Sequence, residues 1–242
     1  MATHTSPRSI NLTNRTKWEV IEATGTTIYI NPESPKAIRV ALANTPERPL
    51  PRRLRRLGSG VWGKTGLVRI GGVGVAIKTE HNPNWAAETH LGLSNLVVNV
   101  ALAEGLKLYN EKSLPAHTLT PELPSPLVNG VEYHGLIVPK IIEDDSACRA
   151  TQMVMAVATG KLASPDNYLP RDIYEPMFNT AMKLAGFDDP SVCCYDLHRE
   201  TTPKPGNLFY SGTNSHGQEV FTKIDSYATD INLHLRFTAN RN

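Results

Sequence analysis

The stretch Gly58-Ser59-Gly60-Val61-Trp62-Gly63, followed by Val75-Ala76-Ile77-Lys78, decides the expected fold of this chain. Three glycines at this spacing let the backbone approach an anion closely and present its N–H groups. In dinucleotide-binding folds such a glycine pattern opens a helix. Here residues 64–72 continue without helical periodicity and end in two glycines. We therefore expect a glycine loop between two strands, and a third strand that carries Lys78 on one face of the sheet.

The remainder of the chain predicts an α+β fold, with strands concentrated in the first half and helices in the second. Alternating and β-branched runs predict further strands and hairpins over 18–21, 26–30, 37–41, 127–138 (with an Asn-Gly turn), 191–195, and 208–210 with 220–224. Apolar spacing of three and four residues predicts helices over 85–106, 147–158 and 170–185. The first helix carries Gly92, where we expect a break.

The composition of the 242 residues is that of an ordinary globular protein, and a net charge of +2 gives no strong field for nucleic acid or membrane. One local exception is Arg52-Arg53-Leu54-Arg55-Arg56, which predicts either a solvated face or a site for phosphate or an acidic partner. No apolar run is long enough to span a membrane. The three cysteines favour a reducing compartment, and the polar residues 1–16 predict a disordered tail.

Polar residues of the second half follow short apolar segments in a suggestive order. Asp196 lies in Tyr195-Asp196-Leu197-His198, and Asn207 follows Pro205-Gly206. Asp225 comes directly after an apolar strand that ends in Lys223-Ile224. Carboxylate oxygens are ligands that Mg²⁺ prefers. The same residue types also form turns and caps, so the order of the motifs carries the interpretation rather than any one of them.

Taken in order, these motifs resemble the protein-kinase superfamily. The resemblance implies a bilobal, kinase-like fold with a β-rich N-lobe over 17–138 and a reduced helical C-lobe over 139–242, with a hinge near 139–142. It implies an ATP-dependent kinase that transfers the γ-phosphoryl group of MgATP to a protein hydroxyl, most naturally of Ser or Thr. By this resemblance Gly58, Gly60, Gly63, Ala76 and Lys78 bind ATP, Glu88 (or Glu104) orients Lys78, Asp196 is catalytic together with Lys78, and Asn207 and Asp225 bind Mg²⁺.

The chain also departs from the family. Cys194-Tyr195 replaces the usual His-Arg before the catalytic Asp, Ser226-Tyr227 replaces Phe-Gly, and six residues, 199–204, are inserted before Pro205. The short stretch after Asp225 leaves no room for a peptide-substrate platform. The chain thus resembles the compact kinases that bacteria or phages use against host cells, which implies a cytoplasmic protein, or one delivered into a host, with a host protein as partner. A small-molecule phosphotransferase and an inactive pseudokinase module stay open as alternatives.

Overall fold

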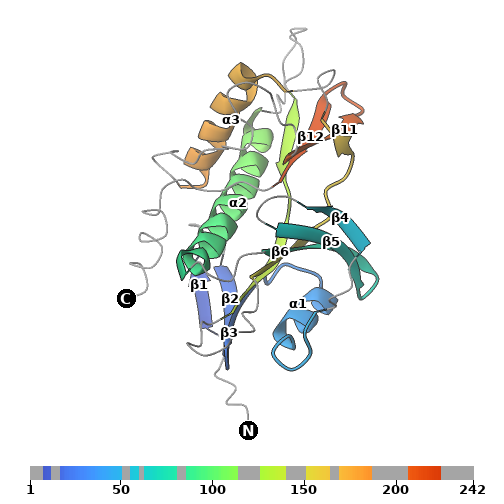
Figure 1. Ribbon diagram of the computed structural model, residues 1–242. Helices are drawn as coiled ribbons and strands as arrows, with labels where there is room; N and C mark the ends of the chain where they lie inside the picture. The colour runs from blue at the N-terminus through green and yellow to red at the C-terminus, as the bar shows by residue number, and fades with distance from the viewer. Residues whose placement is uncertain are drawn as a thin grey trace. The chain divides into compact units, whose positions relative to one another are not determined.

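The computed structural model describes residues 8–11, 17–50, 55–59, 63–80, 86–113, 126–139, 151–163, 169–186 and 207–224. These residues form an α+β fold with three helices: α1 (Lys36–Ala43), α2 (Ala86–Ser113) and α3 (Arg171–Leu184) (Figure 1). The strands are β1 (Arg8–Asn11), β2 (Lys17–Ala23), β3 (Thr26–Ile30), β4 (Arg55–Ser59), β5 (Gly63–Ile70), β6 (Val73–Glu80), β7 (Leu127–Gly130), β8 (Tyr133–Pro139), β9 (Gln152–Ala156), β10 (Lys161–Leu162), β11 (Leu208–Thr213) and β12 (Glu219–Lys223).

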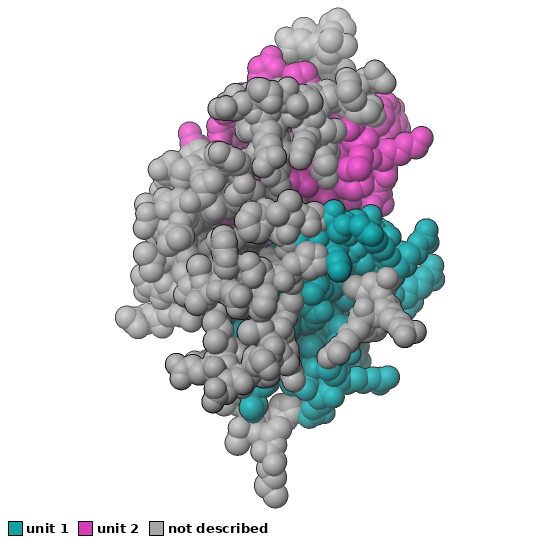
Figure 2. Space-filling view, viewed as in Figure 1, with its two compact units in different colours: residues 1–96, 132–157, 231–242 teal, residues 97–131, 158–230 magenta. Residues whose placement is uncertain are grey.

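The chain divides into two compact units, coloured separately in Figure 2. Unit 1 comprises Met1–Leu96, Glu132–Val157 and Ile231–Asn242, and unit 2 comprises Val97–Val131 and Ala158–Asp230. Helix α2 begins in unit 1 and continues into unit 2. None of the helices in the described part of the chain is both long and apolar enough to cross a membrane.

Unit 1 is built on an eight-stranded sheet in the order β1-β2-β3-β8-β9-β6-β5-β4. Every neighbouring pair in it is antiparallel. The expected meander is confirmed, because β4, β5 and β6 pair in succession and Gly71-Gly72 turns the chain between the last two with φ of 56° and 85°. The strands predicted over 18–21 and 26–30 are confirmed as β2 and β3, which pair with each other and lengthen the same sheet through β3 and β8.

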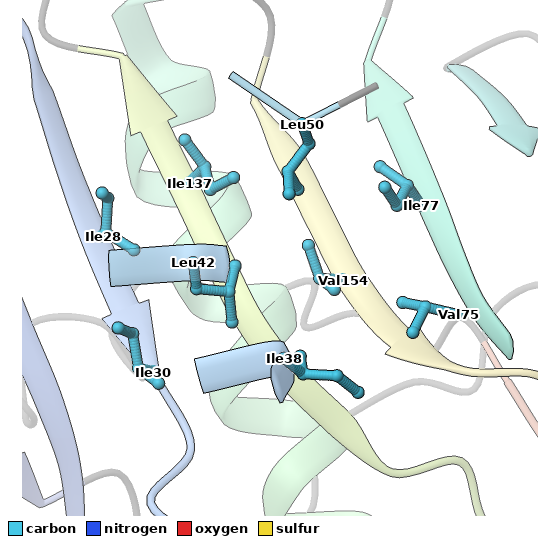
Figure 3. Close-up of a cluster of buried hydrophobic side chains, with 9 residues drawn as sticks. All are labelled: Ile28, Ile30, Ile38, Leu42, Leu50, Val75, Ile77, Ile137 and Val154. Carbon is cyan, nitrogen blue, oxygen red and sulfur yellow. The ribbon is translucent and has the colours of Figure 1, made fainter. Parts of the chain in front are cut away.

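The core of unit 1 forms where α1 packs on one face of this sheet. Ile38 and Leu42, four residues apart on α1, are fully buried against strand side chains (Figure 3). A strand was predicted for 37–41, and this prediction is wrong. Pro35 can precede a first helical turn, and burial of the i, i+4 apolar pair stabilises a helix rather than a strand. The whole cluster consists of Ile28, Ile30, Ile38, Leu42, Leu50, Val75, Ile77, Ile137 and Val154.

Unit 2 contains a four-stranded sheet in the order β10-β11-β12-β7. The predicted late hairpin is confirmed as the antiparallel pair β11–β12. The predicted hairpin over 127–138 is wrong, because β7 pairs parallel with β12 while β8 joins the sheet of unit 1. Gly130 is not a turn glycine: a Cβ there would lie 2.6 Å from the Cα of Ala103. The glycine instead permits close approach of β7 to α2.

Two of the three predicted helices are confirmed. Helix α2 runs unbroken through Gly92, contrary to the expected break, and α3 matches the prediction over 170–185. The helix predicted over 147–158 is wrong where the structure describes this segment, because residues 152–156 form strand β9. Met153, Val154 and Met155 are all buried, so β9 is apolar on both faces and shows no alternation that could distinguish it from a helix.

Candidate functional site

The glycine loop and Lys78 meet on adjacent strands of unit 1. Thr65 of β5 lies opposite Gly58 of β4 on one side and opposite Lys78 of β6 on the other. Residues that oppose each other in antiparallel pairs share one face of the sheet. Since neighbouring strands lie about 4.8 Å apart, the Cα atoms of Gly58 and Lys78 are about 10 Å apart, with only Thr65 between them. The two motifs therefore form one continuous surface.

The polarity of this row changes from one end to the other. Lys78 lies opposite Met153 of β9, which lies opposite Leu136 of β8, and both apolar side chains are fully buried. Lys78, Thr65 and Gly58 are half-buried. The row thus passes from a closed apolar core to a partly open strip with a cation and a hydroxyl. An anionic ligand could contact only the partly open end, because the apolar end is fully buried.

Ala76 and Gly63, two more of the predicted ATP-binding residues, also belong to these strands. Ala76 is two residues before Lys78 and shares its face, where it lies between Leu67 and Met155 and is buried. Gly63 is the first residue of β5, opposite Glu80. Gly60 lies outside the described residues.

The space above Gly58 is open. A Cβ built on Gly58 would meet no atom within 4 Å, and its φ lies outside the left-handed region that favours glycine. Neither packing nor backbone conformation within the described residues requires a glycine at this position. A glycine at position 58 would, however, leave room for a ligand to approach the backbone closely.

The carboxylate expected to orient Lys78 comes from α2. Glu88 is in the first turn of α2, in the part of the helix that belongs to unit 1 with Lys78, but its side chain lies outside the described residues. Glu104, the alternative, belongs to unit 2. Sixteen residues of helix separate the two, which corresponds to about 24 Å along the axis. The two carboxylates therefore cannot both lie beside Lys78. Which of them pairs with Lys78 stays a prediction.

In unit 2 the hairpin register places Asn207 opposite Ile224, the residue that precedes Asp225 in the sequence. The backbone N–H of Ile224 donates a hydrogen bond to the carbonyl oxygen of Asn207 at 2.9 Å, next to the pair Leu208–Lys223. Asp225 is the residue that follows Ile224 in the chain, and its own structure lies outside the described residues. The carbonyl of Ile224 is bonded as well, because the buried Lys223 ammonium donates to it. Sequence reasoning missed Lys223, since nothing in a strand pattern marks a lysine as buried.

The predicted catalytic Asp196 lies outside the described residues, as does the strand predicted over 191–195. Among the residues that the structure does describe, no group of three or more His, Cys, Asp or Glu side chains could hold a metal ion. Asn207 is the one predicted ligand with a described position, so the Mg²⁺ site stays a prediction.

Unit 1 also contains a Ser–His–Glu group that the sequence did not reveal, in which Ser34 and His134 are buried and Glu132 is exposed. Ser34 Oγ lies 2.7 Å from His134 Nδ1, and Glu132 Oε1 lies 3.8 Å from the same nitrogen. In a catalytic triad the two ring nitrogens of the histidine have separate partners: one takes the proton of the serine and the other bonds to the carboxylate. Here Ser34 and Glu132 both approach Nδ1 of His134. Ser34 and His134 are each 3% exposed, so a substrate has no access. Burial lowers the pKa of His134, partly offset by the Glu132 carboxylate, so the imidazole is held neutral.

This group instead attaches the segment before α1 to strand β8. Asn31 donates its backbone N–H to the His134 carbonyl at 3.0 Å and its side-chain amide to the Tyr133 carbonyl at 3.0 Å. These bonds fix the start of α1 against the sheet, which makes the role of His134 structural.

Comparison with known proteins adds no family to this geometry. No protein-family model matches the sequence, and a search of curated proteins finds no similar one.

Proposed function

We propose that this protein is an ATP-dependent kinase with a bilobal, kinase-like fold, which transfers the γ-phosphoryl group of MgATP to a Ser or Thr hydroxyl of a protein. One observation carries the proposal: the row Gly58–Thr65–Lys78 on three adjacent strands. Phosphoryl transfer relies on positioning and electrostatics, and a glycine hairpin beside a strand lysine supplies both for a polyphosphate.

Three further observations support the proposal. The glycine motif joins two strands rather than a strand and a helix, which excludes the dinucleotide-binding use of the same glycine spacing. The strand of Lys78 leads on to α2 with Glu88 in its first turn, the order in which kinases place their lysine and its carboxylate partner. The chain also forms two compact units, as a bilobal fold requires.

The proposed metal would be held by Asn207 and Asp225, whose oxygen atoms are the hard donors that Mg²⁺ takes. The hairpin register fits this role, because Asn207 opposes the residue directly before Asp225. When bound, Mg²⁺ neutralises charge on the phosphates. Asp196 would accept the proton of the substrate hydroxyl, and Lys78 would bind the phosphates of ATP.

The test uses two lysines on adjacent strands. Purified wild type, Lys78→Ala and Lys64→Ala are incubated with radiolabelled ATP, Mg²⁺ and a dephosphorylated casein mixture, and label on protein is measured with time. Lys64 lies opposite Thr79, so it faces the side of the sheet away from Lys78 while carrying the same charge. We expect Lys78→Ala to lower the rate about a hundredfold, and Lys64→Ala to leave it within about twofold of wild type.

Other outcomes contradict the proposal in distinguishable ways. Equal loss in both lysine variants would show that charge, not position, matters. Label that moves only to a small molecule would indicate a metabolite phosphotransferase. ATP that binds without turnover on any acceptor would indicate a pseudokinase module.

A further inference from the structure

Strand β4 forms one edge of the eight-stranded sheet. It pairs with β5 on one side, and on its other side no strand from the described residues pairs with it (Figure 1). An edge strand presents a row of backbone N–H and C=O groups that another extended chain can join. β4 is therefore a place where a partner segment could add a strand.

The surface at this edge is strongly basic. Arg55 and Arg56 on β4 and Lys64 and Arg69 on β5 are exposed, and neither strand carries Asp or Glu. The surrounding segment 48–79 contains eight basic and no acidic residues, while the whole chain has a net charge of +2. The rest of the chain is thus net negative, and positive charge is concentrated on this segment.

The two arginines of β4 point to opposite faces of the sheet. Arg55 lies opposite Leu67, and Arg56 opposite Gly66, its neighbour on β5. A bulge follows Arg56, and Leu57 at this bulge is 47% exposed. A strand added to the edge would meet a guanidinium on each face and an apolar side chain at the bulge.

We propose that the β4 edge binds an acidic, extended segment of a partner protein by strand addition. Acidic side chains at consecutive positions of such a segment point to opposite faces and can each pair with one arginine. The proposal does not rest on kinase activity, because it concerns backbone pairing at the outer edge of β4 and the charges of Arg55 and Arg56, although Gly58 of the same strand belongs to the row of Lys78.

Two other occupants fit less well. A second copy of β4 would bring its own arginines against Arg55 and Arg56, and like charges that face each other across strands are destabilising. Nucleic acid suits basic surfaces, but single strands are held largely by stacking on aromatic side chains. The described residues of β4 and β5 include no aromatic residue.

The test measures fluorescence anisotropy of a labelled peptide, Val-Glu-Asp-Val-Glu-Val, which carries acids at two consecutive positions, with the full chain at about 0.1 M salt. One control peptide replaces each acid by its amide, and another carries N-methyl groups on alternate backbone amides. The protein variants are Arg56→Glu and, as a matched charge reversal on α1, the exposed Lys36→Glu. Circular dichroism verifies that both variants fold.

We expect Arg56→Glu to weaken binding about tenfold or more, and Lys36→Glu to leave it unchanged. Both control peptides should bind at least about tenfold more weakly than the acidic one. The proposal is overturned if the acidic peptide does not bind at up to about 1 mM, or if the N-methylated peptide binds equally well. Tighter binding of a single-stranded oligonucleotide than of the peptide would also overturn it, as would self-association through this edge.

Discussion

Replacing Gly105 of α2 by alanine tests the closest helix contact in unit 2. A Cβ at this position would lie 1.9 Å from the carbonyl oxygen of Ala181 on α3 and 2.4 Å from its carbon. Real Cβ contacts are almost never under 3.0 Å, so the backbones of α2 and α3 must move apart by more than 1 Å. The Ala181 carbonyl also accepts the N–H of Ala185 at 3.0 Å, and this bond ends α3.

The sign of the effect depends on which term is larger. In an unpacked helix, Gly→Ala stabilises by about 1 kcal/mol. Against this stand an overpacking cost of about 3 kcal/mol, since the clash is with backbone rather than a flexible side chain, and about 1 kcal/mol for a weakened hydrogen bond. We therefore expect Gly105→Ala to lower the free energy of unfolding by about 3 kcal/mol.

Urea unfolding followed by circular dichroism measures this difference through the midpoint concentration. The pair Lys107→Ala and Lys107→Gly, at an exposed position of the same helix, gives the intrinsic alanine–glycine difference of about 1 kcal/mol in this context. If Gly105→Ala is neutral, or stabilises as alanine does at position 107, the close approach of α2 and α3 is wrong.

Three further predictions follow from the described residues. Leu42→Ala should destabilise by about 2–5 kcal/mol in thermal or urea unfolding because Leu42 of α1 is fully buried against the sheet, whereas Val40→Ala, at a position of the same helix that is 49% exposed, should change little; similar effects at both positions would contradict the core. Gly58→Val should leave the free energy of unfolding within about 0.5 kcal/mol, because its Cβ meets open space, yet weaken ATP binding measured by calorimetry; unchanged ATP affinity would argue against a phosphate site there. His134 has a lowered pKa in the folded protein, so the unfolded chain takes up its proton first and stability falls as the pH drops below about 6.5. That loss, at most about 1.4 kcal/mol per pH unit, should disappear in His134→Gln when the free energy of unfolding is measured against pH. Parallel pH profiles of the two proteins would show that His134 does not cause the loss.

Local sequence patterns correctly predicted the β4–β5–β6 meander, where glycines determine the conformation of the backbone. Two adjacent glycines at 71 and 72 can turn a hairpin at positive φ, and β5 and β6 pair as that turn dictates. Lys78 was expected on a strand beside the glycine motif, and the register across Thr65 agrees.

The errors share one cause, which is that burial depends on distant parts of the chain. Residues 37–41 are β-branched and apolar enough for a strand, but the pairing of Ile38 with Leu42 against the sheet makes them helical. Asn129-Gly130 has the composition of a tight turn, but the glycine is needed for contact with α2. The buried His134 and Lys223 have no local signal at all, because both are enclosed by strands that are far away in sequence.

The most direct test of the kinase proposal separates ATP binding from phosphoryl transfer. Asp196→Asn removes the proposed proton acceptor and keeps the size of the side chain. We predict that wild type transfers label from ATP to protein, and that Asp196→Asn binds ATP with unchanged affinity but transfers at least about a hundredfold more slowly. Equal transfer rates in the two proteins, or no transfer by wild type to any acceptor, would contradict the proposed function.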